Sequence, residues 1–248
     1  MIILDVKSIS KSFGGVKAVS DCSFQALQGS ITALIGPNGS GKTTVFNLIS
    51  GILKPDKGSI IFNQIEITNL QPHLIARLGI SRSFQQVQLF ENLTLEQNLT
   101  LVFYNDDNKV IRNLFLPQKL SKEKIERALE LLSLFGLEKI FLTPIRELSY
   151  GQRKLVELIR AIVAPHRLIL LDEPVAGVVP GLKNKIQHIL FELRQTGETI
   201  LLIEHDMNFT FSIADRVIVL DKGKVIAEGS PDLIRNNPEV LAAYLGTQ

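Results

Sequence analysis

The chain has 248 residues, of which 45% are hydrophobic, and a formal net charge of +2. This length suffices for one large domain with a substantial buried core, and the hydrophobic share is ordinary for a globular protein. Because lysines and arginines are spread along the chain, the sequence lacks the concentrated basic surface that is typical of nucleic-acid-binding proteins. We therefore expect no nucleic-acid partner.

Cysteine content and hydropathy argue against a disulfide-stabilised, membrane-spanning or secreted protein. Cys22 is the only cysteine, which excludes an internal disulfide. No apolar stretch approaches the roughly 20 residues of a membrane-spanning helix, and the start MIILDVKSIS lacks a basic region followed by an apolar signal core. We expect a cytoplasmic protein that is soluble when isolated, with short apolar clusters that leave room for a protein partner, including one in a membrane.

The first part of the chain predicts strands at 3–8 and 23–26, with Phe13 and Val16 between them. An aromatic ring and an apolar side chain just upstream of a phosphate-binding loop can stack on an adenine and pack against its ribose. Half-buried aromatic residues are also common in ordinary loops, so both interpretations stay open at this point.

The stretch 36–44, GPNGSGKTT, follows an apolar strand at 31–35 and leads into a helix that begins near Lys42. It satisfies the pattern G-x-x-x-x-G-K-[ST] of a phosphate-binding loop, or Walker A motif. An unrelated glycine-rich turn that spells the motif by chance is disfavoured, because the strand before it and the helix after it are the context that the motif requires.

The chemistry of this loop explains its residue types. A triphosphate needs several backbone N–H donors at close range, and glycine lets the chain wrap tightly around it, while the helix start adds unpaired N–H groups and a positive dipole end. Lys42 would bridge the β- and γ-phosphates, and Thr43 would offer its hydroxyl to Mg²⁺. The loop residues expected to bind ATP are Asn38, Gly39, Ser40, Gly41, Lys42, Thr43 and Thr44.

The alternation of strands and helices continues up to residue 84 and is then interrupted. The pattern predicts a strand at 59–62, a helix at 74–78 that ends at Gly79, and a strand at 80–84 that ends next to Gln85. A lone glutamine at a strand end is unremarkable by itself.

The segment from 93 to about 142 has a helical pattern and reads as an inserted helical subdomain. Ser121 can cap a helix that ends at Gly136, and 105–108 is expected to be an exposed turn. The apolar positions expected on one face of that helix are Ile125, Leu129, Leu132 and Phe135.

The sequence LSYGQ at 148–152 heads a helix predicted to run from Gln152 to Ala164. A serine and a glycine at a helix start usually form only a cap. The apolar run that follows, 168–171, ends in Asp172 and Glu173, as expected for a central strand of a parallel sheet.

Paired carboxylates at a strand end can be a solvated turn, but an upstream phosphate loop favours the Walker B interpretation. Asp172 would hold Mg²⁺, directly or through water, opposite Thr43, and Glu173 would orient and deprotonate an attacking water. A helix at 182–193 and a strand at 199–203 then lead to His205. His205 is either a satisfied structural residue or a γ-phosphate contact, because sites gather at the ends of parallel strands.

The remaining residues predict strands at 216–220 and 224–227 and a helical C-terminus from Ser230. Taken in order, the motifs resemble the ATP-binding-cassette (ABC) ATPase family over essentially the whole chain. The matching features are Phe13, GPNGSGKT at 36–43, Gln85, LSYGQ at 148–152, LILLDEP at 168–174 and His205. In that family they look like the adenine-stacking aromatic, Walker A, the Q-loop, the signature motif, Walker B and the switch histidine.

A finer similarity is to the ATPase subunits of branched-chain amino-acid importers, while subunits of urea or short-chain amide importers share much of it. It rests on Tyr150 in the signature, SRSFQ at 81–85, FENLTLEQN at 90–98, IEHDM at 203–207 and the ending at 234–246. One position departs from the subgroup pattern A-A-G-L-N-P after Walker B. Val179 stands where an asparagine is expected at the dimer seam, which puts the polar link between two ATP sites in doubt.

The resemblance implies a P-loop NTPase (RecA-like) α/β fold with a mostly parallel sheet, an N-terminal antiparallel β subdomain and an inserted helical subdomain. It implies one domain over 1–248, with the core at 1–92 and 156–248 and the helical subdomain at 93–155. The implied catalytic residues are Lys42, Gln85, Glu173 and His205; the implied metal-binding residues are Thr43, Gln85 and Asp172; Phe13, Val16, Ser149, Gly151 and Gln152 complete the ATP-binding set.

The implied function is ATP hydrolysis on the cytoplasmic face of a membrane, with ATP and Mg²⁺ as cofactors. The implied partners are a second ATPase subunit in a head-to-tail dimer, transmembrane permease subunits and, indirectly, a substrate-binding protein. A soluble ABC ATPase acting on DNA or ribosomes is disfavoured, because no coiled-coil or zinc-bearing insertion or basic surface is visible. A regulatory module without turnover is disfavoured because Lys42, Asp172, Glu173 and His205 are all present.

Overall fold

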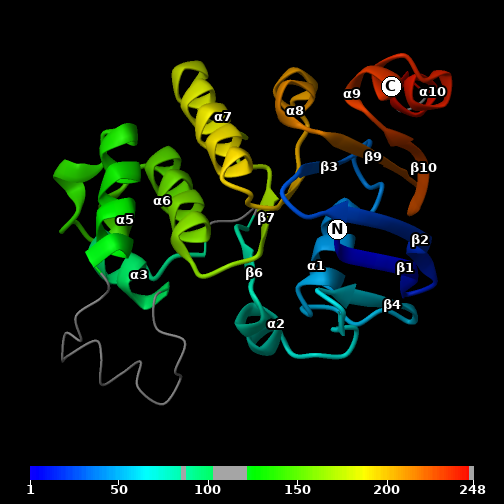
Figure 1. The fold of residues 1–248 in the computed structure, drawn as a ribbon, viewed down its shortest axis with the longest axis horizontal. Coiled ribbons are helices and arrows are strands. Elements are labelled where there is room, and N and C mark those ends of the chain that lie inside the picture. Colours follow the sequence, from blue (N-terminus) through cyan, green and yellow to red (C-terminus); the bar gives the residue numbers. More distant parts are fainter. Residues whose placement is uncertain (85–87, 103–121, 246–248) are drawn as a thin grey trace.

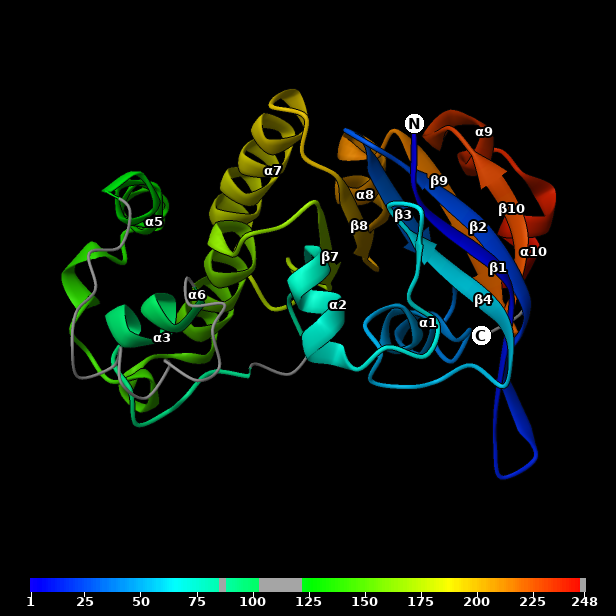
Figure 2. The ribbon, with the colours of Figure 1, turned by 60° about the horizontal axis from the view of Figure 1, so that its bottom comes forward.

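The computed structural model describes residues 1–84, 88–102 and 122–245. Two β-sheets lie together on one side of the molecule, and a lobe of helices lies on the other (Figure 1). Helix α7 (Pro180–Gln195) stands between the helical lobe and the sheets in both ribbon views (Figure 2). Within these described ranges, no helix is both long enough and apolar enough to cross a bilayer.

The larger sheet has the strand order β10-β9-β3-β8-β7-β6 among the described residues, and all neighbours are parallel except β10 and β9. Its central strands are buried at every position and are apolar except for Thr32 and Asp172, as expected for a parallel sheet covered on both faces. The bounds are β3 Ile31–Ile35, β6 Ile80–Arg82, β7 Leu168–Asp172, β8 Ile200–Ile203, β9 Arg216–Asp221 and β10 Lys224–Gly229.

The smaller sheet is antiparallel, with the order β2-β1-β4-β5. Its bounds are β1 Ile2–Phe13, β2 Val16–Leu27, β4 Lys57–Phe62 and β5 Ile65–Glu66. The strands predicted at 3–8 and 23–26 are therefore much longer, and they form one hairpin. Gly14 and Gly15, with φ of 51° and 88°, make a two-residue turn, which needs left-handed backbone and so joins β1 to β2 directly.

Side chains of the larger sheet alternate between two hydrophobic cores. Ile31, Ala33 and Ile35 of β3 point to a core shared with the helical lobe, α7 and α8, whereas Leu34 points to a core shared with the antiparallel sheet and α1. Because successive residues of a strand face opposite sides, this one sheet holds the two halves of the molecule together and fixes where its loops emerge.

The remaining helices of the core pack around these sheets. Helix α2 ends at Gly79, whose φ of 105° is the left-handed termination that the sequence predicted. Helix α8 was not predicted, since it is only one or two turns long and depends on Asp206, whose carboxylate accepts a hydrogen bond from Phe209 N. The bounds are α1 Lys42–Ile49, α2 Pro72–Leu78, α8 Met207–Ile213, α9 Pro231–Arg235 and α10 Pro238–Leu245.

The helical lobe contains α3 (Leu95–Val102), α5 (Lys122–Phe135) and α6 (Tyr150–Val163), with short 3₁₀ turns at Glu138–Ile140 and Ile145–Glu147. Helix α5 stops before Gly136 (φ 70°), as expected. The turn expected at 105–108 lies outside the described residues.

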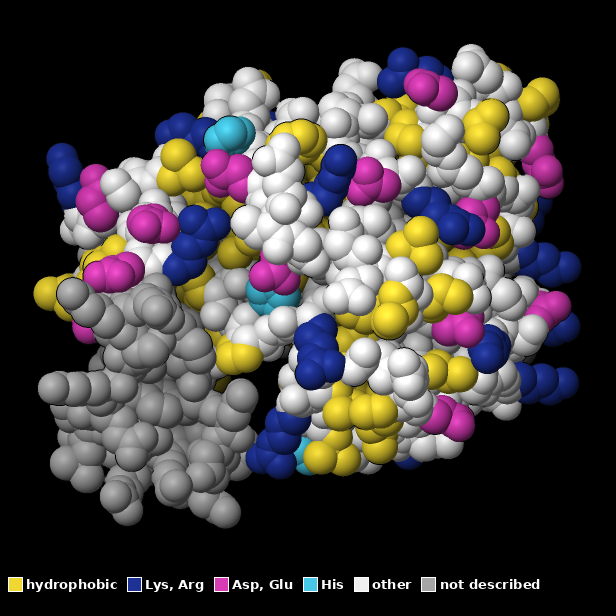
Figure 3. Space-filling view, viewed as in Figure 1, with side chains coloured by type: hydrophobic (Ala, Val, Ile, Leu, Met, Phe, Trp, Pro, Cys, Tyr) yellow, Lys and Arg dark blue, Asp and Glu magenta, His cyan; other side chains and the backbone are white. Residues whose placement is uncertain are grey.

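Several boundaries differ from the prediction by a few residues, and two of them lie beside predicted site residues. Helix α6 begins at Tyr150 rather than Gln152, because Ser149 is its N-cap and forms a capping box with Gln152. Strand β6 ends at Arg82 instead of continuing to 84, because its partner strand β7 pairs with it only as far as Leu170. On the surface, charged side chains of both signs are interspersed over the face that Figure 3 shows.

Candidate functional site

The expected phosphate-binding loop opens into a cavity of about 470 Å³ at the carboxyl ends of β3, β7 and β8. In parallel α/β sheets, ligands bind outside this edge, because the loops that leave neighbouring strands converge there. The lining residues are Ala18, Asn38, Gly39, Gly41, Lys42, Thr43, Thr44, Glu173 and His205. Most of the residues that the sequence placed at the phosphates, together with Glu173 and His205 from other strand ends, thus surround one space.

The backbone of the loop explains why glycine occupies position 41. Gly41 is the N-cap of α1 with φ of 104°, and a Cβ there would lie 2.4 Å from the carbonyl oxygen of Ala18. Any side chain would therefore have to displace the β2 backbone. Gly223 N donates to Ser40 O at 2.9 Å, which ties the loop to the β9–β10 turn.

Lys42 is held inside this loop by three acceptors. Its Nζ donates to Gly36 O at 2.8 Å, to Pro37 O at 2.9 Å and to Ser40 Oγ at 3.3 Å. Burial lowers the pKa of the ammonium from its ordinary value, while the charges of Glu173 and Asp172 act to raise it. The ammonium is thus placed at the cavity wall with carboxylates nearby, and a phosphate oxygen could replace its carbonyl acceptors.

Asp172 ends strand β7 with its side chain only 1% exposed. Its Oδ2 lies 3.3 Å from Arg82 Nη2, and its backbone N donates to Ser83 Oγ at 3.2 Å. Burial raises the pKa of the Asp172 carboxyl, and the neighbouring Arg82 acts to lower it. Asp172 Oδ1 is buried and has no hydrogen-bond partner within the part of the chain that the structure describes.

Glu173, immediately after the strand, adopts left-handed backbone with φ of 51°. Such a conformation costs on the order of 1–3 kcal/mol in a residue with a side chain and persists only where the surroundings enforce it. Here Glu173 N donates to Ile203 O at 2.9 Å, and Glu173 Oε1 lies 3.0 Å from His205 Nε2. The strained turn therefore directs the carboxylate across to the end of β8, into the same cavity as the phosphate loop.

A buried carboxylate fixes the backbone around this pair. Glu204, 2% exposed, accepts hydrogen bonds from Val175 N at 2.8 Å through Oε1 and from His205 N at 3.0 Å through Oε2. Burial raises the pKa of Glu204, and these backbone donors act to lower it. One side chain thus ties the loop after β7 to the loop after β8, which keeps Glu173 and His205 in register.

Several predicted residues are not brought to this cavity. Phe13 and Val16 lie at the tip of the β1–β2 hairpin, 46% and 70% exposed, and are not among the cavity's lining residues. Their assignment to the adenine stays a prediction. Gln85 lies outside the described residues.

The signature residues are also elsewhere. Ser149, Gly151 and Gln152 lie at the start of α6 in the helical lobe and do not line the phosphate-loop cavity of their own chain. Ser149 Oγ accepts from Gln152 N at 3.3 Å, and Gln152 Oε1 accepts from Ser149 N at 2.9 Å. The helix start is therefore closed by a reciprocal pair of hydrogen bonds between Ser149 and Gln152.

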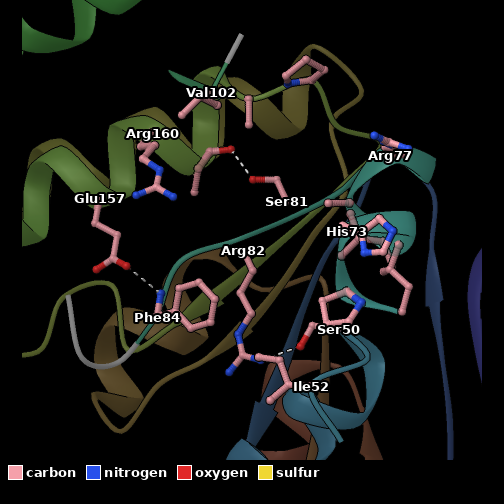
Figure 4. A pocket seen from close by; sticks show the side chains of 17 residues that line it. Ser50, Ile52, His73, Arg77, Ser81, Arg82, Phe84, Val102, Glu157 and Arg160 are labelled. Atoms are coloured by element: carbon pink, nitrogen blue, oxygen red, sulfur yellow. Dashed lines mark hydrogen bonds between the residues drawn. The ribbon is translucent and has the colours of Figure 1, made fainter. Parts of the chain in front are cut away.

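A second cavity, of about 450 Å³, lies between α6 on one side and α2 and β6 on the other (Figure 4). Glu157 of α6 projects toward it, and its Oε1 accepts from Phe84 N and Gln88 N, both at 3.2 Å. Arg160 donates to Gln88 O at 2.7 Å. Glu157 therefore holds both residues that flank 85–87, Phe84 and Gln88, and Arg160 holds Gln88 as well.

Arg82, Glu157 and Glu204 were not singled out from the sequence. Each is a charged residue within, or at the end of, a segment whose other residues are mostly apolar. Because charged residues are rarely buried, a charge at a position expected to be buried is the sequence signal that could have found them. Their partners are contributed by distant segments, which the linear pattern does not specify.

The residues present fit a nucleotide with its metal. The glycine loop leaves N–H groups at the start of α1, Thr43 lines the cavity, and the buried Asp172 Oδ1 is an acceptor with no partner in the described ranges. Hydroxyl and carboxylate oxygens are the ligands that Mg²⁺ prefers. ATP held at Lys42 with Mg²⁺ near Thr43 and Asp172 is thus compatible with the chemistry of the donor set.

Comparison with known families gives two matches. A family model described as ABC transporter matches residues 19–176, and one described as branched-chain amino acid ATP-binding cassette transporter matches residues 224–248. The chain is 37% identical over 251 residues to a probable branched-chain amino acid transport ATP-binding protein, LivG, of Archaeoglobus fulgidus, covering 100% of this chain and 97% of the relative.

Solved structures agree with these matches. An ATP-binding cassette of an ABC transporter in its ADP conformation superposes with a TM-score of 0.83 at 36% identity, covering 99% of each chain. A dimeric cassette in a post-hydrolysis state, bound to ADP and Pi, superposes with a TM-score of 0.79 at 26% identity, covering 92% of this chain and 99% of that one.

Proposed function

This chain belongs to the ABC transporter family and is one of its ATP-hydrolysing cassettes, and we propose that it powers a membrane importer of branched-chain amino acids. The match of residues 224–248 to a branched-chain amino acid cassette model supports this substrate class. The name of the relative LivG supports it too, since this relative is matched over nearly its full length.

The observation that carries the proposal is the convergence of Lys42, Glu173 and His205 on one cavity. Lys42 would bind the β- and γ-phosphates, and Thr43 and Asp172 would hold Mg²⁺, which would supply charge neutralisation at the phosphates. Glu173 accepts the proton of the attacking water, because its carboxylate faces the cavity from the strained turn.

His205 positions Glu173 and contacts the γ-phosphate, as its 3.0 Å approach to Glu173 Oε1 supports. Phe13 and Val16 stack and pack on the adenosine from the exposed hairpin tip. We assign Gln85, which lies outside the described residues, to the catalytic and metal-binding sets.

The working unit is a head-to-tail dimer around ATP. The signature of one chain covers the γ-phosphate bound to the other chain through Ser149, Gly151 and Gln152. The dimeric cassette that superposes on this chain supports such an assembly. Because helix N-termini bind anions through free N–H groups and the helix dipole, the capped start of α6 is suited to this contact.

The permease would dock at the cavity between α6 and β6, which places the cassette at the cytoplasmic face of the membrane as a peripheral subunit. The cavity is large enough for a few side chains and is lined by both apolar and charged groups, among them Ile52, Phe84 and Arg160. We assign the helical subdomain to 93–155 and the core to 1–92 and 156–248, so that α6 continues from one into the other.

Uptake of labelled leucine, isoleucine and valine tests the proposal in source cells that lack the chain. Re-expressed parent chain should restore uptake, whereas Glu173→Gln at the same expression level should not. Urea and a short-chain amide serve as alternative cargoes in the same cells. Restoration of urea or amide uptake, with branched-chain amino-acid uptake unaffected throughout, would overturn the substrate assignment and leave the ATPase assignment in place.

A further inference from the structure

Arg82 makes an unusual set of contacts at the end of β6. Its Nη1 donates to Oδ1 of Asn47 on α1 at 2.8 Å and to Oγ of Ser50, the C-cap of α1, at 2.7 Å, and its Nη2 lies 3.3 Å from Asp172 Oδ2. The guanidinium therefore joins the helix that follows the phosphate loop to the carboxylate that ends β7.

Both side chains of the pair are largely removed from solvent, although Arg82 also lines the cavity between α6 and β6. The Arg82 side chain is 7% exposed and that of Asp172 is 1% exposed. Phe46 and Phe84 lie over the guanidinium, with ring centroids 5.6 and 4.9 Å from its central carbon. Because solvent screening is weak at such a site, the positive charge of Arg82 acts on anything that approaches Asp172.

The two oxygens of Asp172 have different surroundings. Oδ2 is taken up by Arg82, while Oδ1 is buried with no hydrogen-bond partner in the described ranges. A cation that approaches Oδ1 therefore meets a carboxylate whose charge is already balanced. Lys42, at the wall of the phosphate-loop cavity, adds a second positive charge near Asp172.

We propose that Arg82 is a positioning residue that serves as the permanent counter-charge of Asp172, so that a divalent cation binds there only together with the phosphates of a nucleotide. The inference rests on the metal-binding role of Asp172 in the proposed function. Arg82 offsets the negative charge of Asp172, and the phosphates supply the negative charge that the cation then needs. Metal and nucleotide therefore bind as one unit. The three bonds of Arg82 also hold Oδ1 in a fixed orientation.

Binding of Mn²⁺, a spin-visible substitute for Mg²⁺, tests this without turnover. Full-length protein without nucleotide is titrated at constant ionic strength, with free Mn²⁺ followed by electron paramagnetic resonance and the melting temperature measured in parallel. Arg82→Gln should bind Mn²⁺ at least tenfold more tightly than the parent chain. Arg82→Lys, which keeps the charge, should behave like the parent.

Two controls make the result specific. Arg167→Gln removes the same charge at the other end of β7, where the side chain is exposed, and should leave Mn²⁺ binding unchanged. The double variant Arg82→Gln with Asp172→Asn should lose the gained binding. A folded Arg82→Gln that binds Mn²⁺ no better than the parent would overturn the inference, as would a gain that persists without Asp172.

The same samples separate this inference from the proposed function. With ATP present, the parent chain should lower free Mn²⁺ further than the same ATP does without protein, and Asp172→Asn should reduce that difference. If Asp172→Asn does not weaken Mn²⁺ binding in the presence of ATP, the metal-binding role of Asp172 itself is contradicted. If it does, but Arg82→Gln binds Mn²⁺ without nucleotide no better than the parent chain, only the role of Arg82 is contradicted.

Discussion

His205 Nε2 lies 3.0 Å from Glu173 Oε1, although the two residues follow different strands and are separated by 32 positions. The contact joins the left-handed turn after β7 to the end of β8. Glu204 fixes the backbone of both segments by accepting hydrogen bonds from Val175 N and His205 N. A carboxylate held in this way can accept a proton without reorganising, which is the property that hydrolysis at this site needs.

Replacing Glu173 by glutamine should abolish turnover but not ATP binding. The amide keeps the size of the side chain and loses the base, so we expect the hydrolysis rate to fall by at least about a hundredfold. Phosphate release measures the rate, and size-exclusion chromatography with ATP should reveal a persistent dimer. Glu192→Gln on the exposed side of α7 is the matched control. Turnover near the parent rate in Glu173→Gln would exclude this residue as the base.

Lys42→Ala should remove tight nucleotide binding, because the ammonium is the charged group that the cavity wall offers to the phosphates. Titration with a fluorescent ATP analogue measures the affinity, and circular dichroism checks the fold. Lys54→Ala, at an exposed position, should bind like the parent chain. Equal affinities for the two variants would contradict the assignment of the phosphate loop.

Two inactive variants should restore activity when mixed. Gly151→Asp places a negative charge at the signature but leaves the fold intact, since no atom lies within 4 Å of a Cβ built at Gly151. Its phosphate loop is unaltered, and the signature of Lys42→Ala is unaltered. A mixed dimer therefore contains one complete site, and ATPase activity should reappear on mixing. If the mixture stays as inactive as its components, each site is not shared between chains.

Val179→Asn should stabilise the chain. Val179 is the N-cap of α7 and makes no side-chain hydrogen bond there, and it is 60% exposed. Asparagine at an N-cap accepts a hydrogen bond from the first turn and contributes about 1 kcal/mol, which corresponds to a rise of about 2–4 °C in melting temperature at this chain length. Val179→Ala, which cannot cap, is the control. An unchanged melting temperature would show that the loop before α7 does not permit the cap.

Glu157→Gln should stabilise the chain at neutral and alkaline pH but not in acid. Burial raises the pKa of Glu157 above 4.5, although backbone donors and the charges of Arg160 and Lys154 act to lower it. The folded state therefore holds this proton more tightly than the unfolded state, and the parent chain loses stability as pH rises through the raised pKa. Glutamine keeps an acceptor for Phe84 and Gln88 without a charge to bury.

Melting temperatures measured from pH 4.5 to pH 8 test this prediction. Each unit by which the pKa is raised corresponds to about 1.4 kcal/mol of stability. The melting temperature of the variant should therefore rise relative to that of the parent chain as the pH increases across this range. Glu126→Gln, on the exposed part of α5, is the control. A gap between variant and parent that widens toward acid would contradict the raised pKa.

The family, the fold class and the phosphate loop could be predicted because they depend on short-range patterns. The apolar strand at 31–35, the glycine at 41 and the helix at Lys42 are neighbours in sequence, and their geometry follows from local rules. The β1–β2 hairpin was underestimated because its outer half alternates poorly and is exposed at Val16.

Contacts such as Arg82 with Asp172 could not be predicted, since they bring together residues 90 positions apart. The sequence marks each as a charged residue, but only the parallel pairing of β6 with β7 makes them neighbours. Glu157 illustrates the same limit. Its helix was predicted from the apolar positions around it, whereas its buried carboxylate depends on the backbone at Phe84 and Gln88.

Glu157 also has a mechanical consequence. Phe84 N and Gln88 N converge on one oxygen atom, Oε1 of Glu157 on α6. These two backbone positions, which flank 85–87, are therefore attached to the helical lobe through a single side chain, so that a displacement of α6 reaches both of them through the same atom.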